Sequence, residues 1–392
     1  MLRATSCSVL NAHRRYIRPR LEMVRKFLTS VWEPHASAPN SDQKRSTGVA
    51  QRRVGSRTWG KTLHGRAAFL VSVLLGLSFT VPVLAGEVMK PPKNYPLRDL
   101  VIIVPYGTGG GSDQVSRNMA AAIKPFVSVP VRVVNQPGEG GQAAIPGFVS
   151  GSARGYTILQ HTDDLATLYA SGKIKQNPAV DWTPLAIVQV TFSQLYIRPG
   201  DTRFGDWRSF LAYAKARPNK ILVANVGRKG SMERINMLKL EQALGFKTKQ
   251  VSYDNPAERY AALTGGKVDA LFEQPGDVRT FLQANRIKPI LTLLKKRPPA
   301  FAEVPSLTDV GANFEPLLRF RGFYVRNDVP EDRRQYLEWL FARGFESEAF
   351  QAFNRDRYML ADSHYGTSAA RELLSDVLTY YKRVYRELGL TK

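Results

Sequence analysis

A glycine-rich segment, residues 106–113 (YGTGGGSD), has the residue types needed to bind an anion. Its three consecutive glycines allow backbone N–H groups to point toward one site, and Ser112 adds a hydroxyl donor. Apolar, β-branched residues precede the segment at 100–104, and apolar residues at helical spacing follow it. We therefore predict a strand, a tight turn and a helix, with Ser112 or Asp113 as the helix N-cap.

This turn could hold a carboxylate, because a helix N-terminus combines unpaired N–H groups with positive potential. The alternative is that its glycines serve only to pack the helix against a sheet. The spacing excludes the common nucleotide-binding motifs: G-x-G-x-x-G would need glycine where Ser112 stands, and no G-K-[ST] follows.

Charge and cysteine content exclude further classes of protein. The net charge is +23 over 392 residues, but nearly half of it lies in residues 1–86 and the rest is scattered, so we expect no nucleic-acid binding. Cys7 is the one cysteine, so a disulfide within the chain is excluded and a cysteine-ligated metal is disfavoured. His161 and His364 lack metal-ligand spacing, and we expect them to be surface or hydrogen-bonded histidines, with no metal or cofactor.

The N-terminal part of the chain divides into two segments. Residues 1–64 are polar and Arg-rich, and we expect them to be disordered or to lie upstream of the true start. Residues 65–85 have a basic flank, a short apolar run and a final alanine, which is the pattern of a signal peptide cleaved after Ala85. The run is short for an uncleaved anchor, which is the weaker alternative. We therefore expect a periplasmic mature protein, with the export route left open.

Strand and helix signals alternate along the mature chain. Two further strands and a second glycine-rich turn follow the first unit, and a second β/α set repeats this layout before a returning strand at 322–325 and a C-terminal helix from about Ser368. This alternation predicts an α/β protein with mostly parallel sheets and ligand chemistry at the carboxyl ends of the strands. The other expected strands are 129–134, 155–160, 185–190, 195–197, 220–225, 250–253 and 268–272.

Short motifs occur in a fixed order from about Tyr95 to Leu390. They are 95–96 (YP), 101–105 (VIIVP), 109–113 (GGGSD), 135–141 (NQPGEGG), 155–157 (GYT), 251–253 (VSY), 263–269 (LTGGKVD), 295–297 (KKR), 304–307 (VPSL) and 329–330 (VP). In this order, and after a signal peptide, they resemble the substrate-binding receptors of tripartite tricarboxylate transporters, also called Bug-type extracytoplasmic solute receptors.

The resemblance implies a two-domain fold like that of type II periplasmic binding proteins. Each domain would be a mostly parallel sheet flanked by helices, with the ligand in a cleft between the domains. Domain 1 would join residues 87–196 with 320–392, and domain 2 would span 197–319. The implied ligand is a small organic carboxylate or an amino-acid-like molecule, and the implied partners are membrane transporter subunits. We expect a monomeric receptor, not an enzyme.

Ligand contacts are implied by the residues that match the family's motifs. The first turn would donate backbone N–H and hydroxyl groups to a carboxylate, and the second turn would support it. The implied ligand-binding residues are Tyr106, Gly109, Gly110, Gly111, Ser112 and Asp113 in the first turn, Gly138, Gly140 and Gly141 in the second, Thr162 and Asp163 after the third strand, and Ser231 and Tyr253 in the second domain.

Several charged residues depart from the family's pattern. Asp163 and Asp164 stand where small hydroxyl residues are usual, and Glu273 stands where an Asp or a neutral residue is common. These carboxylates would repel a polyanion and could hold an ammonium group. Arg228 and Lys229 would favour an anion instead. The alternative is that these charged side chains point to solvent.

Two other functions stay open at this point. The chain could be a receptor that presents its closed form to a sensor kinase, which the sequence does not distinguish from a transport receptor. An exported serine hydrolase, with Ser112 or Ser231 as nucleophile, is disfavoured because the chain has no G-x-S-x-G motif and no recognisable triad.

Overall fold

The computed structural model describes residues 88–226 and 229–390. The predicted N-terminal extension and signal peptide, and Arg228, therefore lie outside the described residues. Within these two ranges, none of the helices has both the length and the apolarity that a bilayer span requires.

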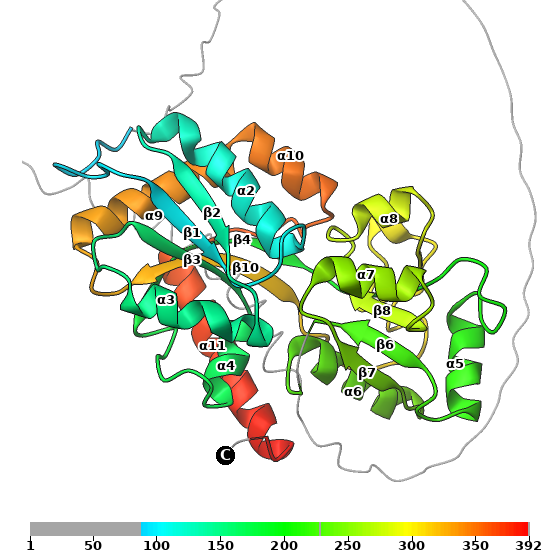
Figure 1. The fold of residues 1–392 in the computed structure, drawn as a ribbon. Helices are drawn as coiled ribbons and strands as arrows, with labels where there is room; N and C mark the ends of the chain where they lie inside the picture. Colours follow the sequence, from blue (N-terminus) through cyan, green and yellow to red (C-terminus); the bar gives the residue numbers. More distant parts are fainter. Residues whose placement is uncertain (1–87, 227–228, 391–392) are drawn as a thin grey trace, which may run out of the picture. The chain divides into compact units, whose positions relative to one another are not determined.

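A six-stranded mixed sheet has the strand order β11-β4-β10-β3-β1-β2 (Figure 1). Strand β1 pairs in parallel with β2 and β3, whereas β10 runs antiparallel to β3 and β4. The strands are β1 (Leu100–Val104), β2 (Val131–Asn135), β3 (Thr157–Thr162), β4 (Trp182–Thr191), β10 (Arg319–Arg326) and β11 (Tyr365–Gly366).

Helices cover both faces of this sheet because its buried strands are apolar on both sides. Along β1, Ile102 and Val104 pack in one core with residues of α2, α9 and α10, while Ile103 packs in the core that includes residues of α3, α4 and α11. The helices are α2 (Gly111–Ile123), α3 (Ile145–Ser150), α4 (Asp164–Ala170), α9 (Glu331–Glu346), α10 (Glu348–Asp356) and α11 (Thr367–Glu387), with short 3₁₀ turns η1 (Lys124–Phe126) and η2 (Glu139–Ala144).

A five-stranded sheet has the order β7-β6-β8-β5-β9. Strand β6 pairs in parallel with β7 and β8, and β5 runs antiparallel to β8 and β9. The elements are β5 (Gln194–Ile197), β6 (Leu222–Asn225), β7 (Lys249–Ser252), β8 (Ala270–Glu273), β9 (Lys288–Thr292), α5 (Trp207–Ala216), α6 (Met232–Leu244), α7 (Pro256–Thr264), α8 (Arg279–Gln283) and η3 (Pro299–Phe301).

The two-sheet α/β architecture is confirmed, but both sheets are mixed rather than mostly parallel. The parallel pairs lie where strand, turn and helix follow one another in the chain, because parallel neighbours need such a crossover. The antiparallel pairs involve β4, β5, β10 and the edge strands β9 and β11. Only two residues separate β4 in the first sheet from β5 in the second, so no helix imposes a parallel direction there. The domain limits given above remain a prediction.

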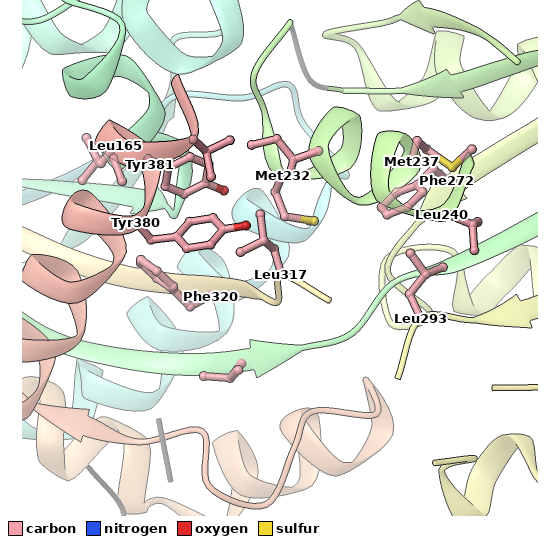
Figure 2. Close-up of a cluster of buried hydrophobic side chains, with 14 of the residues drawn as sticks. Leu165, Met232, Met237, Leu240, Phe272, Leu293, Leu317, Phe320, Tyr380 and Tyr381 are labelled. Carbon is pink, nitrogen blue, oxygen red and sulfur yellow. The ribbon is translucent and has the colours of Figure 1, made fainter. Parts of the chain in front are cut away.

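The largest core cluster contains residues from helices and strands of both sheets. Figure 2 shows Leu165, Tyr380 and Tyr381 from α4 and α11 as part of the same cluster as Met237 and Leu240 from α6. All these side chains are nearly or fully buried. Since buried apolar area stabilises a protein by about 25 cal/mol per Å², this shared cluster stabilises both sheets together.

Candidate functional site

The first glycine turn joins β1 to α2. Helix α2 begins at Gly111 with Gly110 as N-cap, so the expectation that Ser112 or Asp113 caps it is wrong. Asp113 is the third helical residue, and its carboxylate reaches back to accept a hydrogen bond from the Gly109 N–H at 2.9 Å. It also pairs with Arg117 at 2.9 Å. Asp113 therefore fixes the turn's shape, while the first N–H groups of the helix have no intrahelical partner.

The second glycine turn lies against His161. Gly138, Gly140 and Gly141 all have positive φ, which favours glycine, and a Cβ on Gly141 would lie 2.8 Å from Nε2 of His161. Nδ1 of His161 accepts a hydrogen bond from the Thr162 N–H at 2.9 Å, which assigns the imidazole proton to Nε2. Burial lowers the pKa of His161 to about 4, so the ring is a neutral support for the turn.

Two cavities adjoin these turns and share Asp164 and Val226 in their walls. The first is lined by residues of both sheets, including the first turn, the end of β3 and strand β10. The second is lined by Gly140, Lys173, Lys229, Ser231 and Tyr385 among others. The Ser231 hydroxyl is buried at the N-cap of α6 and makes no side-chain capping bond.

Arg319 on β10 binds three buried carboxylates at the wall of the first cavity. Its Nη1 donates to Asp163 at 2.9 Å and to Asp164 at 3.0 Å, and its Nη2 donates to Glu233 of α6. The Tyr106 hydroxyl donates to Asp164 at 2.8 Å. We call Arg319, Asp163, Asp164 and Glu233 the Arg319 cluster; each of these residues is at most 5% exposed.

The carboxylates of the Arg319 cluster have different pKa values. Burial raises the pKa of Asp163 to about 7, with Arg319 opposing the shift. Burial likewise raises the pKa of Glu233. Burial alone would raise the pKa of Asp164, but the Arg319 guanidinium and the Tyr106 hydroxyl lower it below its usual value. Asp164 is therefore the carboxylate of the cluster that stays ionised most readily.

We expect the raised pKa of Asp163 to make unfolding depend on pH. Asp163 binds its proton more tightly when folded, so its contribution to stability is complete below its unfolded pKa of 3.8 and is lost as pH rises through about 7. Between pH 5.5 and pH 8 the loss is about 2 kcal/mol. Urea unfolding at both pH values should show the stability difference between wild type and Asp163→Asn shrinking by this amount. His161 contributes with the opposite sign, but it is present in both proteins, so its contribution cancels in the comparison. A stability difference that does not change with pH would contradict the raised pKa of Asp163.

Two further buried ion pairs line the first cavity. Arg321 on β10 donates to Asp277 at 2.6 Å, and Arg259 on α7 donates to Glu273 at 2.6 Å. The Arg321–Asp277 pair lies against the first turn, because a Cβ added at Gly111 would collide with both side chains. A carboxylate of the protein itself thus lies beside the N-terminus of α2.

The structure brings about half of the expected site residues to these cavities. Six others do not line either cavity, although several support residues that do. Tyr106, Gly110, Gly111, Ser112 and Thr162 line the first cavity and Gly140 and Ser231 the second, whereas Gly109, Asp113, Gly138, Gly141, Asp163 and Tyr253 line neither.

The expectation that the unusual charges could point to solvent is wrong for three of them. Asp163, Asp164 and Glu273 are each at most 5% exposed and ion-paired. Lys229 is exposed but lines the second cavity.

Sequence reasoning missed the arginines of the site. Arg319 and Arg321 stand two residues apart at the start of a strand whose next residues are mostly apolar, so both point to the same face of the sheet. That alternation is a signal for a buried charged site, because arginine is almost never fully buried unless it is paired. Arg259, Gln274 and Asp277 carry no comparable local signal.

Known proteins are similar to this chain in sequence or in fold. A protein of Cupriavidus necator described as "UPF0065 protein in gbd 5'region" is 25% identical over 304 residues, which cover 76% of this chain and 90% of that protein. MatC from Rhodopseudomonas palustris, solved with bound malate, has a TM-score of 0.67 at 21% identity and covers 74% of this chain and 99% of its own. An R. palustris protein solved with adipate has a TM-score of 0.68 at 19% identity, and the match covers 76% of this chain and 99% of that protein.

A family model also matches this chain. The model for the tripartite tricarboxylate transporter family receptor matches residues 115–373, about two thirds of the chain. That match begins within helix α2 and includes the second glycine turn, the Arg319 cluster and every described strand except β1. The chain therefore belongs to the tripartite tricarboxylate transporter receptors, a family of periplasmic solute-binding proteins.

Proposed function

We propose that this receptor captures a small carboxylate-containing solute at the two adjoining cavities and delivers it to a tripartite tricarboxylate-type membrane transporter. The solute would bind between a domain of residues 87–196 with 320–392 and a domain of residues 197–319. Malate and adipate, with which two similar proteins were solved, are small carboxylates, and this supports a small carboxylate as the solute. The same site would serve a receptor that signals to a sensor kinase, but none of the described residues favours that role.

The observation that carries the proposal is the position of the Asp277 carboxylate beside the first turn. Asp277 belongs to the loop after β8, yet its carboxylate lies against Gly111 at the start of α2. Carboxylates are favoured at this position, because a helix N-terminus offers unpaired N–H groups and positive potential. A solute carboxylate would displace Asp277 and take its place.

The second cavity offers another position for an anion. Lys173 and Lys229 line it, and the unpaired, buried Ser231 hydroxyl lies at the N-terminus of the 13-residue helix α6. A charge-assisted hydrogen bond from either lysine is about twice as strong as a neutral one. A solute with two polar ends could therefore contact both cavities.

We also infer export through the signal peptide predicted at 65–85, which supplies the periplasmic location that the family requires. N-terminal sequencing of the protein from a periplasmic fraction should find a chain that begins near Gly86. A mature chain that retains the apolar run would contradict cleavage.

A thermal-unfolding screen of carboxylates, amino acids and aromatic acids tests the proposed function. A solute present at 100 times its Kd should stabilise the folded state by about 2.7 kcal/mol and raise the melting temperature. Calorimetric titration of each hit should give a Kd in the micromolar range or tighter. Stabilisation by no carboxylate, together with ester hydrolysis that Ser112→Ala abolishes, would overturn the proposal in favour of a hydrolase.

A further inference from the structure

The Arg319 cluster contains more negative than positive charge. One guanidinium, that of Arg319, is shared by the carboxylates of Asp163, Asp164 and Glu233. The other two buried pairs of the first cavity, Arg259–Glu273 and Arg321–Asp277, are each matched one to one. They therefore do not neutralise the excess, and buried carboxylates in excess need either protons or a further cation.

Two carboxylate oxygens of this cluster also lack hydrogen-bond donors. Oδ1 of Asp164 and Oε2 of Glu233 are buried and accept no hydrogen bond within the described part of the chain. Asp164 is 5% exposed and lies in the wall shared by the two cavities. Unsatisfied oxygens on ionised, buried carboxylates are costly, and an N–H donor with positive charge would satisfy both requirements at once.

A proton on Asp163 does not remove the imbalance. Burial raises the pKa of both Asp163 and Glu233, but a single proton on either of them still leaves two carboxylates that share the one charge of Arg319. Of the two adjoining cavities, Lys173 and Lys229 line the second but not the first, and both are exposed, so they remain available for a solute carboxylate. The first cavity therefore has an excess of negative charge, whereas the second is also lined by two lysines.

From this geometry we propose that the solute carries a protonated amine or amidine in addition to its carboxylate, and that this nitrogen binds against Asp164, the carboxylate of the Arg319 cluster that lines both cavities. The inference rests on the proposed function and narrows its solute class to zwitterions such as amino acids. The solute's nitrogen would donate to the unsatisfied Oδ1 of Asp164, and its positive charge would offset the excess negative charge of the cluster. Its carboxylate would bind the first turn or the second cavity.

Matched solute pairs test the inference on the unmodified receptor. Calorimetry on the full chain, freed of solute by unfolding and refolding, would compare succinate with aspartate, glutarate with glutamate and butyrate with 4-aminobutyrate. We expect the amino member of the best-binding pair to bind at least about tenfold more tightly than its partner. Equal or tighter binding of the amino-free members overturns the inference and leaves the proposed function standing. Binding of no member of any pair, in the thermal screen or here, overturns both.

Two buried neighbours provide matched variants. Asp164→Asn keeps the size of the side chain that lines both cavities but removes its charge, and should reduce the preference for the amino member to about onefold. Asp163→Asn removes an adjacent charge that lines neither cavity, and should reduce the preference much less than Asp164→Asn does. An unchanged preference in Asp164→Asn, with wild-type affinity for both members, overturns the placement of the nitrogen at Asp164.

Discussion

Gly111→Val will weaken solute binding about 100-fold or more, which corresponds to about 2.7 kcal/mol. A side chain at Gly111 would occupy the space beside the N-terminus of α2 that the Asp277 carboxylate fills in this structure and that a solute carboxylate would take. The fold should persist, because the φ of Gly111 is not positive and the colliding atoms are the ends of the Arg321 and Asp277 side chains. Calorimetric titration with the best solute measures the loss.

Gly205→Val is a matched control for this substitution. Gly205 precedes α5, its φ is not positive, and a Cβ there would meet no atom within 4 Å. The control should bind solute with wild-type affinity. If Gly111→Val also keeps that affinity and a native circular dichroism spectrum, the first turn does not contact the solute.

The second large effect concerns Arg319→Met, which should lower the free energy of unfolding by about 3–5 kcal/mol at pH 8. The substitution keeps an apolar stem but leaves Asp163, Asp164 and Glu233 buried without their shared guanidinium. Three carboxylates would then have to take up protons or unfold. Urea unfolding at pH 8 measures the loss, which should shrink at pH 5.5 because protons then replace part of the missing charge.

Two controls separate charge from packing in this experiment. Adding Asp163→Asn and Glu233→Gln to Arg319→Met should recover much of the lost stability, since both substitutions remove a carboxylate while keeping its volume. Arg297→Met breaks a solvent-exposed pair with Asp309 and should leave the unfolding midpoint nearly unchanged. An Arg319→Met protein as stable as wild type at pH 8 would show that the cluster is held neutral by protons alone.

Much of the fold follows from local sequence signals. Asp206 caps α5 with a complete capping box, and α6 ends at Gly245, whose left-handed conformation suits glycine. Strand β9 carries no clear signal, because Pro289 argues against a strand interior. The structure places β9 at the edge of its sheet, where the missing N–H of proline is tolerated, and the register with β5 shifts beside Tyr196.

The site could be predicted only in part, because its chemistry depends on residues far apart in the chain. The glycine turns are contiguous, and their positive φ values and close packing follow from the absence of side chains. The Arg319 cluster joins residues from β10, the end of β3 and α6, which only the folded chain brings together. Gly110, expected only as part of the turn, is also the N-cap of α2. Asp113, one of the two residues expected to cap the helix, instead accepts a hydrogen bond from the Gly109 N–H.

The shared apolar cluster of Figure 2 has a consequence for cooperativity. Helices α6 and α11 contribute to one continuous apolar cluster. A fragment that contained only the β5–β9 sheet would therefore expose apolar side chains to water and would aggregate. Melting of the intact receptor should appear as a single calorimetric peak, with both sheets lost together.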